Sequence, residues 1–574
     1  RMSPSVLQHF AIFAAVVLVS PAAADADAAP AASGGAPAQF QTAPPGAESP
    51  TQAELRTKAA HRQRRIILNN DGDDSLAPMK DGSPVAEQFL RQRTSPLAGS
   101  QVDTISYCSI RSFGSVLHRT EVAENLTTHL KGSFPNSLMS GLLSQGTDPL
   151  QVMLEFCHAK KIEVFCSMRM NDTHDAANPA LRPQLKVDHP EYLLGSETKK
   201  PLYGQWTAVD YGQAAVRELA VRYIQEVCTR YDVDGVELDF FRHPVLFKAH
   251  AYNGAVGDGE RELLTEMLRR IRAVADAAGT RRGRPILIAI RVPDSVEYCR
   301  TIGIDLERWL REGLTDLLAT GGYFRLNPWE YSVRLGHQYG VSVYPSMDAP
   351  VAVLDPRVPA REFTLTEKLT WVTATEERPM DARRNSLESW SGRAAVALKA
   401  GADGVYLFNL FTPTHPLLWQ IGDPASLAGK NKLYFVNWRG TRQPPSNFVP
   451  KSNTFFHERP LNPLFPLEIT STPLSVPLPV GDETPAAKNR RARPKLTAEL
   501  WIQPAASIAS VTVTCNGRLL ERGTTDSDRV KFALDADLIK PGSNVFVLRR
   551  PADGGAPKAF LRDIVLQVEY PGGR

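Results

Sequence analysis

Short apolar runs alternate with stretches of helical length along most of this chain, and that alternation constrains its fold more than any other feature. Eight runs of strand length lie in order at Arg65–Asp71, Val102–Ser109, Ile162–Asp172, Val233–Phe240, Pro285–Asp294, Thr315–Gly322, Val341–Asp348 and Asp403–Asn409. Amphipathic segments separate them, for example DPLQVMLEFCHAKK and SLESWSGRAAVALKAGA. Because strands that alternate with helices form parallel sheets, the pattern predicts an α/β protein built on a closed (β/α)8 TIM barrel.

The sequence after residue 420 loses its helical periodicity and shows alternating apolar runs separated by turn residues. These runs are KLYFVNW, TPLSVPLPV, KLTAELWIQ, SVTVTCNGRLL, DRVKFALDA, SNVFVLRR and IVLQVEY. We therefore expect the barrel at residues 63–425 and a C-terminal β-sandwich domain at residues 426–574. The sandwich offers no convergent pair of acids and is interpreted as an accessory domain, while Pro444–Pro466 is expected to wrap against the barrel.

The first 24 residues predict a signal peptide. AIFAAVVLVS supplies an apolar core of suitable length, and Ala22-Ala23-Ala24 supplies small residues for cleavage. An uncleaved membrane anchor is the alternative, and no later segment predicts a stable membrane span. Residues 25–62, rich in Ala, Pro, Gly and Ser, are expected to form a disordered linker. These features predict a secreted or periplasmic protein.

Charge and motif content exclude several classes of partner. The chain has 66 Lys+Arg and 62 Asp+Glu, a net charge of +4 on 574 residues, so it shows no basic footprint for nucleic acid. The six cysteines form no CxxC pair and are interpreted as buried free thiols. Since there is no zinc spacing, phosphate loop or dinucleotide fingerprint, neither a metal nor a cofactor is predicted. Nothing points to a particular oligomeric state.

The stretch YDVDGVELDFFRHP, from Tyr231 to Pro244, is the strongest candidate for chemistry. Side chains alternate across a strand, so Glu237 and Asp239 share one face while Val236, Leu238 and Phe240 share the other. Barrel enzymes keep their chemistry at the carboxyl ends of the strands. We therefore predict Asp239 as the anionic catalytic group, a nucleophile or general base, with Glu237 either tuning it or forming a structural hydrogen bond.

Acid catalysis needs a second carboxyl group facing Asp239, and the ends of the fifth and seventh strands supply Asp294 and Asp348 as candidates for the protonated acid. Either could instead be a loop residue or cap. Asp239 could likewise form a structural salt bridge to Arg169, Arg242 or Arg291 rather than take part in chemistry.

Other polar and aromatic residues at or near the strand ends predict a hydrated cleft for a polyhydroxylated substrate, because unpaired buried charges are costly. The predicted substrate-binding residues are Asp71, Tyr107, Arg169, Asn171, Asp172, Trp206, Arg242, Arg291, Tyr323 and Asn409. The long connection from Thr173 to Gln213 is expected to shape the cleft. Asp71-Gly72-Asp73-Asp74 could hold calcium but is first a turn, and His174 has no Ser or Cys nucleophile to complete a triad.

DHPEYLLG (Asp188 to Gly195) and AVDYGQAAVRELAVRYIQEVCTRYDVDGVELDFFRHP (Ala208 to Pro244) resemble the glycoside hydrolase-like family 10 barrels, which are exported proteins. The resemblance implies a polysaccharide-acting glycosidase barrel, and it carries over to Asp234, Gly235, Asp239, Arg242 and Pro244. The DGVELD core also resembles the chitinase-like barrels. Phe241 stands where those proteins have their catalytic Glu, so their substrate-assisted mechanism is not expected.

The sequence is compatible with three functions. The leading hypothesis is an exported glycoside hydrolase that uses paired carboxylates on a poly- or oligosaccharide. The alternatives are a catalytically inactive carbohydrate-binding or cell-surface scaffold protein and a metal-dependent hydrolase with aspartate ligands.

Export gives the first testable prediction. Because Phe10–Ala24 predicts a cleaved signal, N-terminal sequencing of the protein recovered from its host should find a chain that begins near Asp25. Recovery of a full-length cytosolic form would contradict the prediction.

Overall fold

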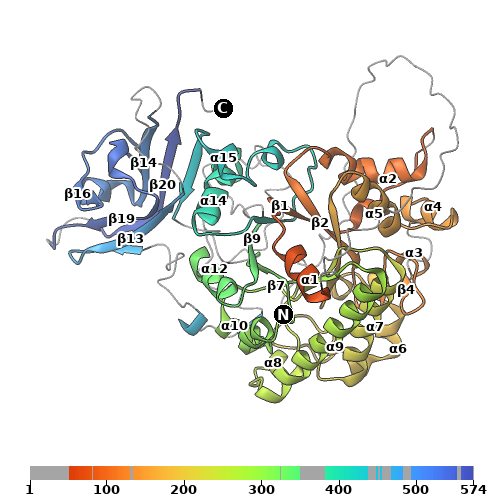
Figure 1. Cartoon of the computed structure of the whole chain (residues 1–574). Helices are drawn as coiled ribbons and strands as arrows, with labels where there is room; N and C mark the ends of the chain where they lie inside the picture. Colours follow the sequence, from red (N-terminus) through yellow and green to blue (C-terminus); the bar gives the residue numbers. More distant parts are fainter. Residues whose placement is uncertain are drawn as a thin grey trace, which may run out of the picture.

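A computed structural model describes residues 51–80, 82–129, 134–322, 325–348, 382–436, 448–449, 453–455, 467–481, 493–552 and 557–572. Within these residues the first large unit is a closed barrel of parallel strands with helices around it (Figure 1). Its strands are β1 (Ile66–Asn70), β2 (Val102–Ile110), β5 (Glu163–Arg169), β6 (Gly235–Asp239), β7 (Leu287–Val292), β8 (Leu317–Thr320), β9 (Ser342–Asp348) and β10 (Val405–Phe408). All eight strands predicted from the sequence are present, so the TIM barrel is confirmed.

Helices connect successive barrel strands, as the alternating pattern predicted. The helices are α1 (Gln52–Ala60), α2 (Val85–Arg93), α3 (Leu126–His129), α4 (Leu138–Ser144), α5 (Pro149–Ala159), α6 (Gln184–Asp188), α7 (Ala214–Arg230), α8 (Lys248–Ala251), α9 (Asp258–Arg282), α10 (Val296–Ile302), α11 (Leu306–Arg311), α12 (Trp329–Gln338), α14 (Leu387–Lys399) and α15 (Pro424–Leu427). Several begin at a capping residue: the Asp148 carboxylate accepts the Gln151 N–H before α5, and Ser386 Oγ accepts the Ser389 N–H before α14.

Four aspartates at the amino-terminal ends of strands fix the register of the barrel. Each accepts a backbone N–H from the strand before it in the barrel or from the residue that precedes that strand. The bonds run from Arg65 to Asp103 (2.8 Å), from Val164 to Asp234 (2.8 Å), from Ile288 to Asp316 (2.7 Å) and from Val343 to Asp403 (2.7 Å). Register decides which side chains face the interior, so these bonds also help to place the residues at the other end of the strands.

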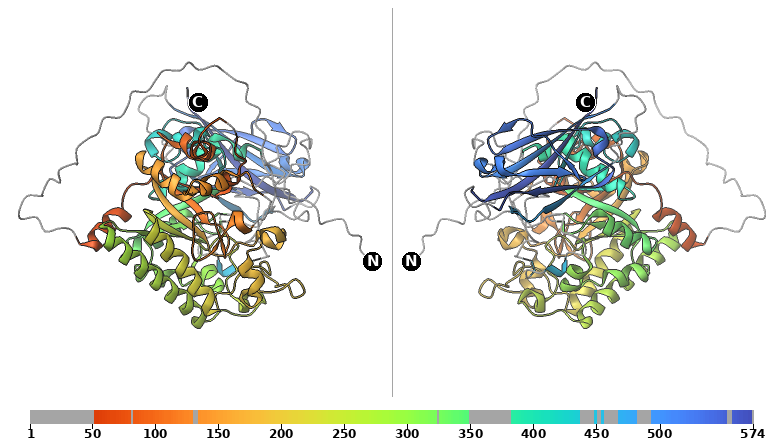
Figure 2. Two further views of the ribbon diagram at one scale, coloured as in Figure 1. Left: turned by 90° about the vertical axis from the view of Figure 1, so that its right-hand side faces the viewer. Right: turned by 90° about the vertical axis from the view of Figure 1, so that its left-hand side faces the viewer.

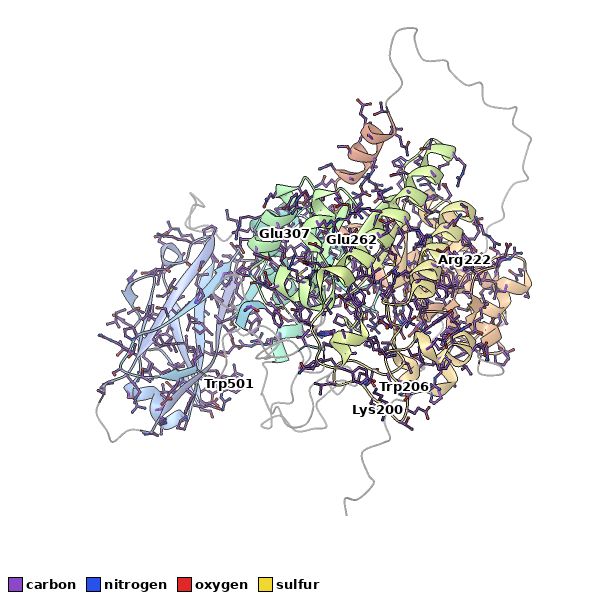
Figure 3. The ribbon with its side chains drawn as sticks, turned by 90° about the horizontal axis from the view of Figure 1, so that it is seen from below. Lys200, Trp206, Arg222, Glu262, Glu307 and Trp501 are labelled. Atoms are coloured by element: carbon purple, nitrogen blue, oxygen red, sulfur yellow. The ribbon has the colours of Figure 1, made fainter. Side chains whose placement is uncertain are left out.

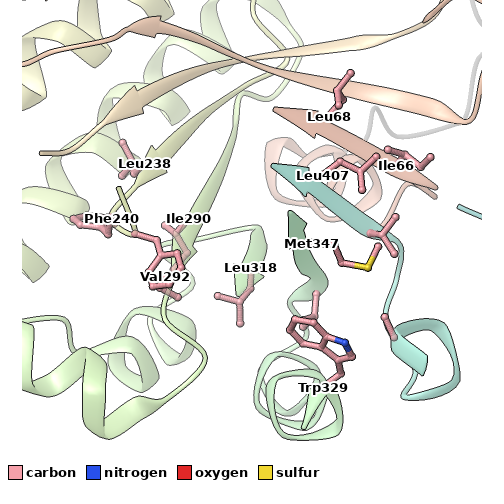
Figure 4. Packing of buried hydrophobic residues seen from close by; sticks show 14 of the residues in the cluster. Ile66, Leu68, Leu238, Phe240, Ile290, Val292, Leu318, Trp329, Met347 and Leu407 are labelled. Carbon is pink, nitrogen blue, oxygen red and sulfur yellow. The ribbon is translucent and has the colours of Figure 1, made fainter. Parts of the chain in front are cut away.

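The two faces of each barrel strand enter different environments. Outward-facing side chains such as Leu238 and Ile290 pack in the main hydrophobic core between the strands and the helices (Figure 4). The interior holds a smaller apolar cluster that includes Phe165 and Tyr406. Gly235 is required here, because a Cβ at that position would lie 2.6 Å from the Phe165 ring. The missing side chain therefore makes room for Phe165 in the interior, below Glu237 and Asp239.

The C-terminal region contains two antiparallel sheets, and these confirm the predicted β-sandwich. One sheet contains β11 (Lys432–Phe435), β12 (Leu467–Ile469), β14 (Lys495–Gln503), β17 (Thr525–Asp526), β18 (Arg529–Leu534) and β20 (Ala559–Glu569). The other contains β13 (Leu474–Val480), β15 (Thr512–Cys515), β16 (Arg518–Leu519) and β19 (Gly542–Arg549). A short pair, β3 (Ser115–Val116) and β4 (Glu124–Asn125), lies apart from both. Asn516 and Gly517 form the turn that joins β15 to β16, with φ of 49° and 83°.

The sandwich packs directly on the barrel, as the views in Figure 2 show. Gly392 of α14 lies against β11, because a Cβ there would come within 2.3 Å of the Leu433 carbonyl oxygen. The Arg384 guanidinium pairs with Asp563 of β20, and Arg383 pairs with Glu499 of β14 at 2.7 Å. The boundary predicted at residue 425 falls between β10 and β11 and stays a prediction.

The described residues between β11 and β12, Phe448, Val449 and Asn453–Phe455, include two that contact the barrel. The Phe448 carbonyl oxygen lies 2.6 Å from His250 Nε2, and the Phe455 carbonyl accepts a hydrogen bond from Asn327 Nδ2 at 3.1 Å. The described part of the predicted wrapping segment therefore does contact the barrel. All six cysteines are buried and free, which confirms that prediction. In the part of the chain that the structure describes, no helix has the length and apolarity of a membrane span.

Gly392→Ala tests the contact between the two units. The added methyl group has no space against β11, so we expect the free energy of unfolding to fall by about 1–3 kcal/mol in chemical denaturation. Gly259→Ala in α9 is the matched control, because a Cβ there meets nothing within 4 Å and alanine favours helix. Equal stability of the Gly392→Ala chain and the wild type would show that α14 and β11 do not pack as described.

Candidate active site

Asp239 and Arg291 form a buried ion pair at the carboxyl ends of β6 and β7. Arg291 Nη2 lies 2.8 Å from Asp239 Oδ2, and the two residues are directly opposite in the strand register. Asp239 Oδ1 accepts the backbone N–H groups of Phe241 and Arg242, each at 3.0 Å. Both carboxylate oxygens therefore have partners, and the residue is 2% exposed. The structural salt bridge considered from the sequence is present, and Arg291 is its partner.

Aromatic rings enclose the guanidinium of Arg291. Its carbon lies 4.0 Å from the Phe408 ring centre and 5.4 Å from that of Phe241. The backbone of Gly322, at the end of β8, comes so close that a Cβ there would lie 2.6 Å from Arg291 Nη1. Arg291 is fully buried as a result, and its ion pair lies in a low-dielectric environment.

Glu237 lies deeper inside the barrel and is also buried. Ser167 Oγ–H and Tyr406 O–H donate to its Oε1 at 2.7 and 3.1 Å. Burial, followed by the nearby charge of Asp239, raises the pKa of Glu237. Both of the roles predicted for Glu237 fit this position, since it forms structural hydrogen bonds and lies near Asp239.

A second network lies at the end of β5. Arg169 Nη1 donates to Asp172 Oδ2 at 2.9 Å, and His174 Nδ1 lies 2.9 Å from the same oxygen. Arg242 Nη2 approaches His174 Nε2 at 3.3 Å, which joins this network to the loop after β6. Burial opposes ionisation of Asp172, but His174 and Arg169 outweigh it and hold the pKa of this carboxyl well below its usual range.

The third polar cluster follows β1. Asp71 pairs with Arg93 of α2 at 2.5 Å, and Asp73 pairs with Arg111 at 2.7 Å. Although burial favours the neutral acid, Arg93 and Arg169 lower the pKa of Asp71. Asp74 differs, because burial raises its pKa to about 6 while it accepts one hydrogen bond from Asn70 Nδ2 at 2.8 Å. Two carboxyl groups on one short turn therefore differ in proton affinity.

Asp294, at the end of β7, binds backbone in the loop after β8. Its carboxylate accepts N–H groups from Leu326 (2.9 Å) and Asn327 (2.8 Å), and burial raises its pKa to about 6. The geometry matches the loop-cap alternative considered from the sequence. Asp348 ends β9 in register with Phe408, and its side chain lies outside the described residues, as does Tyr323.

Three predicted substrate-binding residues lie in structural positions outside these networks. Tyr107 points to the helical layer, where its ring packs on Phe89 of α2 with centroids 6.3 Å apart; Ser106, the next residue along the strand, takes the opposite face. Asn171 Nδ2 donates to the carbonyls of Val209 and Val245 at 3.1 and 2.7 Å. Trp206, labelled in Figure 3, lies in the loop after β5. The guanidinium carbon of Arg182 lies over its ring, 4.5 Å from the ring centre.

Asn409 directly follows β10 in the left-handed conformation, with φ of 56°. A pocket opens nearby, between the end of β1, α2 and the loop after β10. Its lining residues are Leu68, Asn69, Asn70, Arg93, Leu97, Ile105, Leu410, Phe411 and Pro413. Arg93 stacks on the half-exposed Phe411 at 4.7 Å, so this arginine connects the pocket to Asp71.

Sequence reasoning missed Arg93 and Arg111. It named Asp74 only in the calcium alternative, and it named His174 only to exclude a nucleophile triad. Arg93 lies on a helix with no signal of its own, because its partner is fixed by the tertiary fold. Among the described residues, no group of three or more His, Cys, Asp or Glu side chains is placed to hold a metal ion. In the turn at residues 71–74, which was considered as a calcium site, Asp71 and Asp73 pair with Arg93 and Arg111.

A family model described as glycosyl hydrolase-like 10 matches residues 86–255, which confirms the resemblance drawn from the sequence. No curated protein matches the chain. Among solved structures, alpha-L-fucosidase isoenzyme 2 from Paenibacillus thiaminolyticus is 16% identical, with a TM-score of 0.35, over 63% of this chain and 48% of that one. This chain thus spans about half the length of that fucosidase.

Two further solved structures are similar at the same level. Chitinase ChiA74 from Bacillus thuringiensis is 10% identical, with a TM-score of 0.36, over 87% of this chain and 100% of that one. The PgaB (BpsB) glycoside hydrolase domain from Bordetella bronchiseptica is 12% identical, with a TM-score of 0.35, over 62% and 96%. The assignment of the barrel itself rests on the strand pairing described above.

Glu237→Gln tests the electrostatics of the barrel interior. A carboxyl group whose pKa is raised on folding stabilises the fold fully below its unfolded pKa, and that stability is lost as pH rises through the folded pKa. Glutamine stays neutral and its oxygen can accept both hydrogen bonds. In denaturant titrations the stability of the variant relative to wild type should therefore increase as pH rises from the usual glutamate pKa, about 4.3, through the raised pKa of folded Glu237.

Glu226→Gln is the control with the opposite sign. Burial opposes ionisation of Glu226, but hydrogen bonds from His118, Thr120 and the Glu121 N–H hold its pKa at about 2. The contribution of Glu226 to stability is present above its unfolded pKa and is lost as pH falls. Glu226→Gln should therefore be less stable than wild type at neutral pH. A relative stability of Glu237→Gln that does not change with pH would contradict the assignment.

Proposed function

Because residues 86–255 match the glycosyl hydrolase-like 10 family, we propose that this chain is an exported glycoside hydrolase acting on a poly- or oligosaccharide. The observation that carries the proposal is the position of Asp239, whose carboxylate is buried inside the barrel at the carboxyl end of β6. In (β/α)8 enzymes the chemistry takes place at this end of the strands. Asp239 is the anionic group of the proposed mechanism, and Arg291 is its counter-ion.

The surrounding chemistry supports a carbohydrate substrate. Carboxylate and guanidinium groups from the ends of β1, β5, β6 and β7 meet in the paired networks described above, which suits multiple hydrogen bonds to hydroxyl groups. Asp71, Asp172, Arg169 and Arg242 are proposed to contact the substrate. The sandwich, which packs on α14, is proposed to be accessory.

The proton donor of the paired-carboxylate mechanism was predicted to be Asp294 or Asp348. A pKa of about 6 suits Asp294 for this role, although its oxygens are occupied by the N–H groups of Leu326 and Asn327. Asp348 is proposed as the other candidate for the proton donor, because it lies at the end of β9.

A second candidate function is a carbohydrate-binding barrel without turnover. The full engagement of Asp239 by Arg291 and two backbone N–H groups favours it, since a nucleophile must be reachable by the anomeric carbon. Export, to the periplasm or to the medium, is proposed for both functions on the sequence of residues 1–24.

A reducing-sugar assay on a panel of polysaccharides, with and without chelator, separates the functions. The glycosidase proposal predicts release of reducing ends that chelator does not change. Binding to a polymer without release would support the scaffold function, and release abolished by chelator would support a metal-dependent hydrolase.

A pair of variants tests Asp239 itself. Asp239→Asn leaves Arg291 buried without a counter-ion, so it should both destabilise the chain and lower turnover. Asp239→Asn/Arg291→Met removes both charges and should restore much of the stability. If Asp239 takes part in the reaction as the anionic catalytic group, turnover by the double variant still falls on the order of a hundredfold or more relative to wild type. A stable double variant with wild-type turnover would show that Asp239 is only structural.

A further inference from the structure

We propose that His174 is a catalytic residue of this site, which carries the proton between solvent and the glycosidic oxygen, and that Asp172 positions it. The inference rests on the proposed glycoside hydrolase function and deepens it by naming His174, in place of Asp294 or Asp348, as the group that moves the proton. Nothing in the sequence assigned this role, because His174 was considered only as part of a nucleophile triad.

The carboxylate of Asp172 fixes the orientation of the imidazole. His174 Nδ1 lies 3.0 and 2.9 Å from the two oxygens of Asp172, and the His174 backbone N–H donates to Oδ1 at 3.1 Å. A carboxylate can only accept hydrogen bonds, so Nδ1 carries a hydrogen and Nε2 is the nitrogen that gains or loses a proton.

Asp172 is itself held firmly as an anion. Its side chain is 5% exposed, and Arg169 Nη1 donates to its Oδ2 at 2.9 Å. A buried anion next to an imidazole stabilises the imidazolium that forms when Nε2 takes up a proton. This is the electrostatic requirement for a histidine that cycles between acid and base.

His174 is also accessible, unlike the acids around it. Its side chain is 34% exposed, whereas Asp172 and Asp239 are almost fully buried. Nε2 lies 3.3 Å from Arg242 Nη2, and the backbone N–H of Arg242 donates to Asp239 Oδ1. One residue therefore touches both the nitrogen that would move the proton and the proposed anionic carboxylate.

The proposed proton transfer accompanies cleavage of the glycosidic bond. The imidazolium gives its Nε2 proton to the glycosidic oxygen while the bond from that oxygen to the anomeric carbon breaks, and the bonding electron pair stays on the oxygen. Asp239 stabilises or bonds to the positive anomeric carbon. A water molecule then attacks this carbon, any bond between the carbon and Asp239 breaks with its electron pair returning to the carboxylate, and the water gives one proton to Nε2, which regenerates the imidazolium. The Arg242 N–H must turn away from Nε2 whenever Nε2 is protonated.

His243 provides a matched control. Its ring lies 5.4 Å from that of His174, but burial lowers its pKa well below the usual range and its Nδ1 is 3.2 Å from the Asn171 carbonyl oxygen. None of the hydrogen bonds described for His243 is to a carboxylate, so its imidazole stays neutral. His243→Asn is a mild change, because asparagine tolerates the φ of 53° at this position.

The experiment compares leaving groups on whichever sugar the polysaccharide assay identifies. For His174→Gln, turnover of the unactivated oligosaccharide should fall on the order of 10²- to 10⁴-fold. The kcat/KM of His174→Gln for the 2,4-dinitrophenyl glycoside should change little, because that leaving group needs no proton and kcat/KM excludes the later attack of water. His243→Asn should be close to wild type on both substrates. Equal losses on both substrates, or equal losses in the two histidine variants, would overturn the role of His174.

A second measurement is independent of turnover. In long-range 1H–15N spectra of the histidine-labelled chain, His174 should be the Nδ1–H tautomer, and Asp172→Asn should change that tautomer while leaving His243 unchanged. A His174 tautomer that is unaffected by Asp172→Asn would overturn the positioning role. If the wild type cleaves no glycoside, the proposed function fails and the proton-transfer role fails with it, and the tautomer still decides whether Asp172 positions His174.

Discussion

The buried ion pair between Asp239 and Arg291 is the interaction on which the carboxyl-terminal face of the barrel depends. Two opposite charges removed from water must be paired, and removal of one partner from such a pair costs about 3–5 kcal/mol. Around this pair, the backbone of the loop after β6 binds Asp239, and Phe408, Phe241 and Gly322 enclose Arg291. Four strands therefore converge on one pair of charges.

Local pattern was enough to predict the barrel and the inward face of β6. The eight apolar runs gave all eight strands, and alternation within β6 placed Glu237 and Asp239 inside. The same alternation, not applied to β2, would have shown that Ser106 and Tyr107 face opposite ways. Partners could not be predicted, because contacts such as Arg93 to Asp71 and Asp294 to the loop at Leu326–Asn327 join residues that only the tertiary fold brings together. The face of the barrel could thus be read from the sequence, but not the hydrogen bonds that divide its acids among different roles.

Those hydrogen bonds give different partners to aspartates that occupy similar positions, at the ends of strands, in the sequence. Asp239 binds an arginine, Asp172 binds an arginine and a histidine, and Asp294 binds backbone. The half-exposed His174 joins the second of these networks to the loop that follows Asp239. The chemistry proposed for the site therefore follows from tertiary contacts that combine the loops after β5 and β6, within the region that matches the family model.

The central claim is that a saccharide is cleaved at this face of the barrel, and a crystal structure of the Asp239→Asn chain with an intact oligosaccharide tests it most directly. The account predicts that the anomeric carbon of the scissile unit lies within about 3.5 Å of the residue 239 side chain. It also predicts that His174 Nε2 lies about 2.6–3.2 Å from the glycosidic oxygen. An oligosaccharide bound only on the sandwich, or on the barrel away from the ends of β5 and β6, would contradict the account.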